Sequence, residues 1–258
     1  MKYIKLFENY MISQKLSGIE DLLQSDMIDN ILDWGFDFLK KGVSYLMKNE
    51  LIIELLKNIK PDLLKEGKVR LIFPLEDWET DALEGLKKSG IVTGVFKKTS
   101  EALDFIERLS GVGIKIKELI LGSHGNKDFF FITKEEGPNG HINKFFREIS
   151  KHIDKNGLVF ITSCHGADQL NNLFIASRFL KVRVWGSKGI YNYITNTSEG
   201  GFYWCDYEKL KSIDKELKEL IYTTRNKAFT SNKWDDFNKL LLDNKICGFS
   251  TKSPISWI

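Results

Sequence analysis

The chain has little cysteine, almost no net charge and no long hydrophobic run. It has 258 residues and a mass of 29.8 kDa, and its 38 Lys and Arg residues exceed its 35 Asp and Glu residues by three. This balance excludes a broad electropositive surface, so neither nucleic acid nor an acidic membrane is expected as a partner. The sequence contains no apolar run of about eighteen residues, so no transmembrane helix is predicted. Met1–Glu20 also lacks the apolar region of a secretory signal, so we expect a cytoplasmic protein.

The three cysteines are an odd number, scattered over the last hundred residues. Their number and spacing do not indicate a disulfide framework. They also lack the paired spacing of a zinc site, so no metal is expected. In a reducing compartment Cys205 and Cys247 are expected to be packed as small apolar side chains. With 42% hydrophobic and 28% charged residues, the composition is that of a soluble globular protein and excludes a disordered chain.

Residues 1–67 are predicted to form a helical segment. Apolar residues recur there at three- and four-residue intervals, as at Ile28, Ile31 and Leu32. Gly35 and Gly42 favour two or three short helices over a single long one. These helices are expected to pack on the rest of the protein, as a pro-segment or a docking element.

Residues 68–258 are predicted to form an α/β domain with a helical tail. Apolar runs predict strands at 69–73, 91–96, 119–121, 158–161 and 182–185, and helices at 78–88, 100–109, 142–153 and 167–180. Strands that alternate with helices of this length form parallel βαβ units. Uninterrupted apolar strands indicate a mostly parallel sheet with helices on both faces. In the tail, 202–205 is expected to be a short edge strand, and 206–222 and 234–242 are expected to be helices.

Two predicted strands end on reactive side chains, and functional groups gather at the carboxyl ends of strands in such sheets. The third strand runs into His124 and Gly125, and the fourth into Cys164. If the two strands are neighbours, His124 and Cys164 emerge about 5 Å apart. An imidazole at that distance can activate a thiol nucleophile. The N–H groups of Gly125 and Cys164 would then form a two-donor oxyanion hole.

The two blocks LILGSHG and LVFITSC, ending at Gly125 and Cys164, resemble the signature of caspase-like cysteine peptidases. That group includes caspases, metacaspases, clostripain, gingipain, separase and the autoprocessing domains of bacterial toxins. The resemblance covers about 68–205. It implies a caspase-haemoglobinase-like fold and an endopeptidase acting on protein or peptide substrates without a cofactor. His124 matches the catalytic histidine of the family and Cys164 its nucleophile.

The chain departs from true caspases around the nucleophile. True caspases have Gln-Ala before the cysteine and Arg-Gly or Gln-Gly after it, whereas this chain has Ser163-Cys164-His165-Gly166. In addition, Cys164 lies 40 residues (164 − 124) beyond His124, a spacing below the roughly 50 residues of caspases. The sequence is therefore more similar to the bacterial and toxin-type members, which argues against aspartate specificity. The resemblance assigns the substrate pocket to Trp185, Gly186, Ser187, Lys188 and Tyr191, where Asp168 and Glu199 would favour a basic residue.

Other interpretations of the same residues remain open. The chain could be a catalytically inactive caspase-like scaffold that acts as a binding or phage virion-associated protein, or an unrelated α/β protein. Leu6-Phe7-Glu8 is similar to the Leu-x-Glu processing signal in the leaders of some tailed-phage proteins. His165 is expected to be a loop histidine, because neighbouring residues leaving a strand point in different directions. Either Asp77 or a backbone carbonyl could orient His124.

Overall fold

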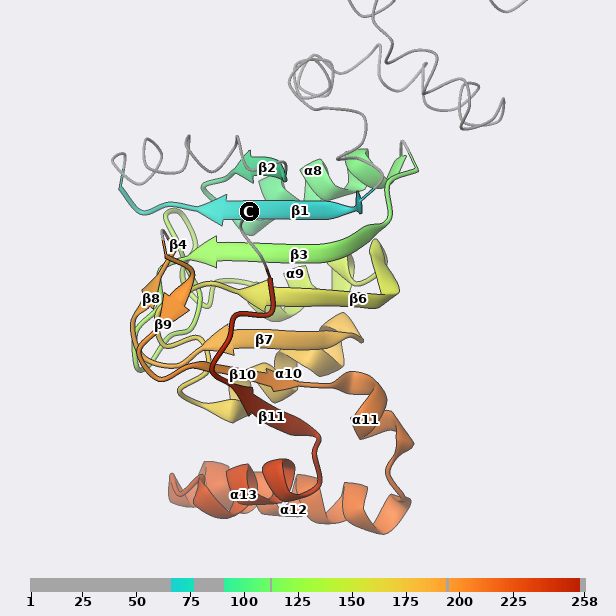
Figure 1. Cartoon of the computed structure of the whole chain (residues 1–258), viewed down its shortest axis with the longest axis vertical. Coiled ribbons are helices and arrows are strands. Elements are labelled where there is room, and N and C mark those ends of the chain that lie inside the picture. Colours follow the sequence, from blue (N-terminus) through green and yellow to red (C-terminus); the bar gives the residue numbers. More distant parts are fainter. Residues whose placement is uncertain (1–65, 77–90, 112, 194, 256–258) are drawn as a thin grey trace, which may run out of the picture.

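A computed structural model describes residues 66–76, 91–111, 113–193 and 195–255 of the chain (Figure 1). Its centre is a seven-stranded sheet with the order β11-β10-β7-β6-β3-β1-β2. The strands are β1 (Lys68–Phe73), β2 (Val92–Val95), β3 (Ile116–Ser123), β6 (Ile153–Ile161), β7 (Arg183–Ser187), β10 (Phe202–Cys205) and β11 (Cys247–Ser250). The strands from β7 to β2 pair in parallel, whereas β10 is antiparallel to both β7 and β11. The α/β class and the mostly parallel sheet are confirmed.

Helices connect β2 to β3, β3 to β6 and β6 to β7, and two small hairpins lie outside the sheet. The helices are α8 (Thr99–Gly111), α9 (Ile142–Ile149), α10 (Leu170–Leu180), α11 (Tyr207–Ser212), α12 (Lys215–Ser231) and α13 (Asp235–Asp243). The hairpins are β4 (Ile132–Thr133) with β5 (Gly137–Pro138), and β8 (Tyr191–Asn192) with β9 (Thr197–Ser198). Every strand predicted between 69 and 205 is present.

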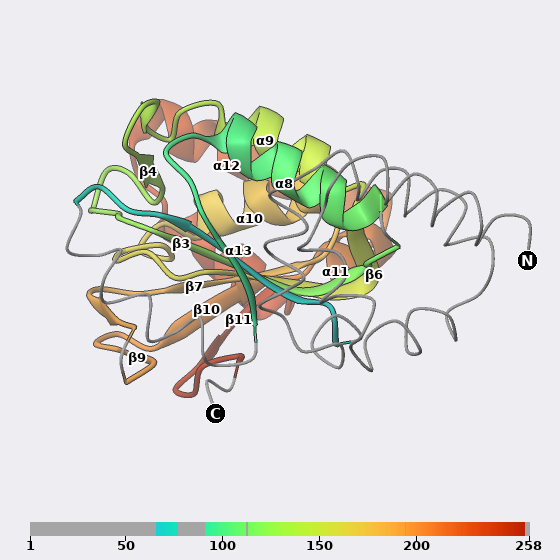
Figure 2. The same ribbon diagram turned by 90° about the horizontal axis from the view of Figure 1, so that it is seen from above.

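The helices α8, α9 and α10 lie together on one face of the sheet (Figure 2). In the part of the chain that the structure describes, the other face carries no helix. It is covered by Tyr191 of β8 and by Ile255 near the C-terminus, which pack on Ile120, Phe160 and Phe202. The prediction of helices on both faces is therefore met on one face only. The helix predicted at 78–88 and those predicted before residue 66 lie outside the described residues.

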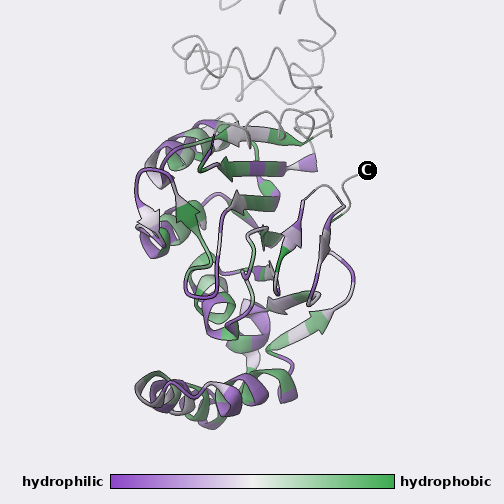
Figure 3. Cartoon of the chain, turned by 90° about the vertical axis from the view of Figure 1, so that its left-hand side faces the viewer, coloured by the Kyte–Doolittle hydropathy of each residue, from purple (hydrophilic) through white to green (hydrophobic). Residues whose placement is uncertain are grey.

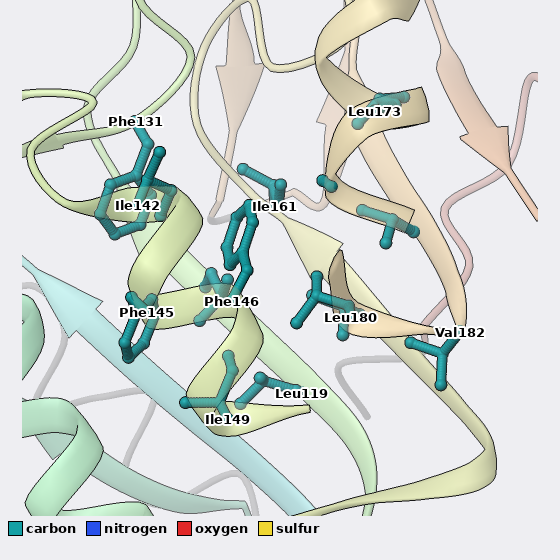
Figure 4. Close-up of a cluster of buried hydrophobic side chains, with 14 of the residues drawn as sticks. Leu119, Phe131, Ile142, Phe145, Phe146, Ile149, Ile161, Leu173, Leu180 and Val182 are labelled. Atoms are coloured by element: carbon teal, nitrogen blue, oxygen red, sulfur yellow. The ribbon is translucent and has the colours of Figure 1, made fainter. Parts of the chain in front are cut away.

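Helix α9 shows why the helical face is stable. Its apolar residues Ile142, Phe145, Phe146 and Ile149 follow the three- and four-residue spacing of one helix face, and all are buried. They pack in the same cluster as Leu119 of β3 and Ile161 of β6 (Figure 4). Burying an aromatic side chain of this kind stabilises the fold by about 3 kcal/mol.

The opposite faces of each central strand are both apolar but belong to different clusters. Leu119 and Leu121 of β3 face the helices, whereas Ile120 faces the second cluster. Because side chains alternate along a strand, a shift of one residue in pairing would exchange these two sets. The burial pattern therefore fixes the register of β3 against its neighbours.

Hydropathy differs between the sheet and the helices at its end. The central strands are predominantly apolar, while α12 and α13 at one end of the sheet carry alternating polar and apolar stretches (Figure 3). Among the described helices, none combines the length and apolarity that a bilayer span requires.

Three predicted helices differ from the observed ones. The helix predicted at 142–153 ends at Ile149, because Ile153 already pairs with Ile116 as the first residue of β6. The helix predicted from Ala167 begins at Leu170. The helix predicted at 206–222 is divided into α11 and α12, because Asp206 and Asp214 each accept hydrogen bonds from backbone N–H groups of a new first turn.

The end of the sheet corrects two further expectations. The strand 202–205 is internal rather than an edge, because the unpredicted β11 pairs with it. In this pairing Cys205 lies directly opposite Cys247, and the two form a buried disulfide. The expectation of separately packed, reduced cysteines is therefore wrong for this pair. The pairing was not visible in the sequence because β11 consists of only four residues, one of them Gly248.

We predict that the Cys205–Cys247 disulfide contributes about 4 kcal/mol to the free energy of unfolding, since it closes a loop across a sequence separation of 42 residues. Replacing both cysteines by Ala should lower the urea midpoint accordingly, and Cys164→Ala serves as the control that keeps the disulfide. Titration of thiols in the urea-unfolded, unreduced protein should detect one thiol; three would contradict the pairing.

Candidate functional site

The ends of β3 and β6 meet at the carboxyl edge of the sheet. The two strands pair in parallel, and from Glu118 to Leu121 each residue of β3 lies opposite the residue 40 positions later, as Leu121 does opposite Ile161 (161 − 121). The Thr162 N–H continues this ladder by donating to the Leu121 carbonyl oxygen at 2.9 Å. His124 follows the end of β3, and Cys164 lies three residues past the end of β6. The sequence prediction that these two residues follow neighbouring strands is therefore confirmed.

Gly125 touches the backbone of the cysteine segment. A Cβ atom at Gly125 would lie 2.2 Å from the Cys164 carbonyl oxygen and 3.1 Å from both Cβ and Oγ of Ser163. Contacts this short require a residue without a side chain. The glycine thus lets the loop after His124 lie against the segment that carries the nucleophile candidate.

Cys164 belongs to the second face of the sheet. It packs with Phe160, Trp185 and Tyr191 in the cluster on that face. Its side chain is partly exposed, and it is the free cysteine of the chain. The thiol Sγ lies 3.9 Å from the Tyr191 carbonyl oxygen, to which it donates.

The His124 backbone is held by a short extended pairing. The Ile132 N–H donates to the His124 carbonyl oxygen at 3.0 Å, and the two residues form an isolated β-bridge. The intervening turn is closed by Asn126, whose side-chain oxygen accepts from the N–H groups of Asp128 and Phe129, both at 2.9 Å. His124 is therefore fixed on both sides, by β3 before it and by this turn after it.

Ser163 ties the cysteine segment to both neighbouring loops. It is fully buried, and its Oγ donates to the Phe130 carbonyl oxygen at 2.5 Å. Its own carbonyl oxygen accepts from Ser187 Oγ, also at 2.5 Å. Sequence reasoning missed this role, because a serine before the cysteine carries no signal of what it contacts. The predicted pocket residue Ser187 is consequently buried, and its side chain holds the carbonyl group of the residue before Cys164.

Two backbone N–H groups of these segments have no acceptor within the described chain. Across the residues that the structure describes, neither the Gly125 N–H nor the Cys164 N–H donates a hydrogen bond to another group of the chain. Such N–H groups, preorganised at one place, can stabilise an oxyanion that develops on a bound carbonyl. These are the two donors that the sequence suggested.

The remaining predicted pocket residues fall into two groups. Trp185 and Tyr191 pack in the same cluster as Cys164, and Gly186 lies against the backbone of Gly166, where an added Cβ would come within 3.0 Å. Lys188 is directed elsewhere, with its Nζ 5.5 Å from the centre of the Tyr203 ring.

The two predicted acidic pocket residues hold backbone groups. Glu199 accepts from the Ile190 N–H at 3.2 Å, and Asp168 accepts from the Gly189 N–H at 2.8 Å. The second oxygen of Asp168 lies 2.7 Å from His165 Nδ1. His165 therefore has a specific acidic partner, which the expectation of a plain loop histidine did not include.

A buried arginine lies on the second face of the sheet, in register with Ile120 of β3. The Arg70 side chain is 2% exposed. Its burial lowers the pKa of the guanidinium to about 10, and the nearby Tyr191 opposes this shift. Within VRLIF every neighbour of Arg70 is apolar, and no sequence pattern there indicates a role for this residue. Asp77, the proposed orienting group for His124, lies outside the described residues.

The site offers no cluster of metal ligands. Among the described residues, no group of three or more His, Cys, Asp and Glu side chains is placed to hold a metal ion. The segments that follow the two neighbouring strands carry a thiol, a histidine and two backbone N–H donors. This combination supports nucleophilic acyl transfer.

Comparison with models of known protein families, with curated proteins and with solved structures finds no significant match to this chain.

We predict that Gly125→Ala destabilises the protein by about 1–3 kcal/mol, because the added methyl group would collide with the Cys164 carbonyl oxygen. Gly122→Ala is the matched control on β3, since its Cβ would meet the nearest atom at 3.5 Å, an ordinary contact. Urea unfolding compares the two variants. Equal midpoints would show that the loop after His124 does not lie against the cysteine segment.

Proposed function

We propose that the protein is a cysteine endopeptidase in which Cys164 is the nucleophile and His124 its proton-transfer partner. The observation that carries the proposal is the parallel pairing of β3 with β6, because His124 follows the end of the first strand and Cys164 follows the end of the second. The His-Gly and Ser-Cys strand ends also support the resemblance to caspase-like peptidases. The substrate is a protein or peptide.

The reaction can be written with the groups of this chain. Cys164 Sγ forms a bond to the carbonyl carbon of the peptide, and the thiol proton passes to His124. The carbonyl electron pair moves to oxygen, where the N–H groups of Gly125 and Cys164 stabilise the negative charge. His124 then protonates the leaving nitrogen as the C–N bond breaks, which leaves a thioester on Cys164.

Water completes the cycle. It attacks the thioester carbonyl carbon and gives a proton to His124, and the C–S bond breaks. The carboxylic acid product leaves, and the proton returns from His124 to the Cys164 thiolate. The chain is thereby restored without an added cofactor.

We expect Cys164→Ala and His124→Ala each to lower kcat/KM by about a thousandfold or more, because each removes a partner of the bond-making step. A peptide library with mass-spectrometric detection of cleavage should first identify a substrate for the wild type. His141→Ala, which changes an exposed histidine before α9, is the control and should retain activity.

A peptidyl electrophile that labels catalytic thiols supplies the second readout. It should label the wild type and not Cys164→Ala. If the wild type cleaves no member of the library and the probe labels both proteins equally, the peptidase proposal is wrong. A non-catalytic scaffold that binds a partner or is carried in a virion then becomes the better account of this fold.

A further inference from the structure

The segment that follows Cys164 is joined to the loop after β7 by a set of hydrogen bonds centred on Asp168. One carboxylate oxygen accepts from the Gly189 N–H at 2.8 Å, and the other lies 2.7 Å from His165 Nδ1. The His165 N–H in turn donates to the Gly189 carbonyl oxygen at 2.7 Å. We call these three residues, His165, Asp168 and Gly189, the clamp.

Both segments joined by the clamp are close to the Cys164 thiol. His165 directly follows Cys164, and Gly189 precedes by two residues the Tyr191 whose carbonyl oxygen contacts Sγ. The loop is further held where the Ala167 N–H donates to the Ser187 carbonyl oxygen at 2.8 Å. Movement of the loop would therefore change the surroundings of the thiol.

Gly189 is suited to this position for a conformational reason. Its φ is +72°, in the region that residues with side chains rarely adopt. This turn directs both its N–H and its carbonyl oxygen toward the His165–Asp168 segment. The hydrogen bond from the Gly189 N–H to the Asp168 carboxylate therefore restrains the loop at a glycine, where the backbone itself has the most conformational freedom.

We propose that Asp168 is a positioning residue, which holds the 187–191 loop in place beside Cys164. Its function in substrate selection would then be indirect. Both of its oxygens already have partners in the chain, and its side chain is 25% exposed. The proposal goes beyond the peptidase assignment but rests on it for its kinetic consequence, because the positioned group is the proposed nucleophile.

The alternative function for Asp168 is to attract a basic residue of the substrate, and Asp168→Asn separates the two. The Asn side-chain oxygen can still accept from the Gly189 N–H, and its amide can donate to a neutral His165 Nδ1. Asn therefore preserves positioning but removes the charge. Asp168→Ala removes both.

The experiment measures hydrogen exchange at the Gly189 amide together with peptidase kinetics. For Asp168→Ala we expect exchange at Gly189 to become about tenfold faster or more, since its acceptor is lost. We expect kcat/KM to fall by about tenfold or more, mainly in kcat, for substrates with a basic or a neutral residue before the scissile bond alike. Asp168→Asn should restore both quantities to within about threefold of the wild type.

A matched control is Asp154→Ala at the opposite end of β6. Asp154 also accepts a backbone N–H, that of Asn156, at 2.9 Å, but it lies far from Cys164 along the strand. Exchange at Gly189 and the kinetics should both be unchanged in this variant. If Asp168→Ala does not fold, His165→Ala removes one side of the clamp and should shift both readouts in the same direction by a smaller factor.

Two results would overturn the proposal. The first is a loss confined to substrates with a basic residue and not restored by Asn, which would make Asp168 a charge selector. The second is unchanged exchange at Gly189 in Asp168→Ala. If the wild type proves inactive, the peptidase assignment fails separately. The clamp is then judged by exchange at Gly189 and by the alkylation rate of Cys164, which Asp168→Ala should change by about fivefold and Asp168→Asn should restore.

Discussion

The fixed pairing of β3 with β6 is the constraint on which the site depends. Both strands are buried on two faces, so a shift by one residue would carry Leu121 and Ile161 away from the helices and replace them with Ile120 and Phe160. The hydrophobic effect thus acts on residues that take no part in chemistry. Its consequence is a 40-residue offset that brings two distant segments of the sequence to one edge of the sheet.

Hydrogen bonds of side chains hold the loops around Cys164, which the pairing of β3 with β6 brings only to the same edge of the sheet. Past Thr162 no further ladder between β3 and β6 holds the described chain, and polar side chains take its place. Ser163 joins the loop of Phe130 on one side and Ser187 on the other, while Asp168 holds Gly189. Hydrogen bonds are directional, and the two at Ser163 are also buried, where leaving one partner unpaired costs about 1–3 kcal/mol. They therefore restrict the loops around the thiol to one arrangement.

The sequence predicted what depends on local pattern. Strands with continuous apolar runs, and the reactive residues at their ends, were recognisable because burial leaves a compositional signal. It did not predict β11, whose four residues show no such run, nor the pairing of Cys205 with Cys247 that follows from that strand. The partners of Asp168 were equally hidden, since Gly189 lies 21 residues away and contributes only backbone atoms. Tertiary contacts of this kind follow from the fold and not from residue type.

The central claim is that His124 acts on the thiol of Cys164, and alkylation kinetics test it most directly. The rate of Cys164 alkylation by iodoacetamide near pH 6.5 should be measured for the wild type and for His124→Gln, with adduct formation mapped to Cys164 by mass spectrometry. Because thiolate is the reactive form and a neighbouring imidazolium favours it, the account predicts a rate about tenfold or more slower in the variant. Equal rates in two folded proteins would contradict it.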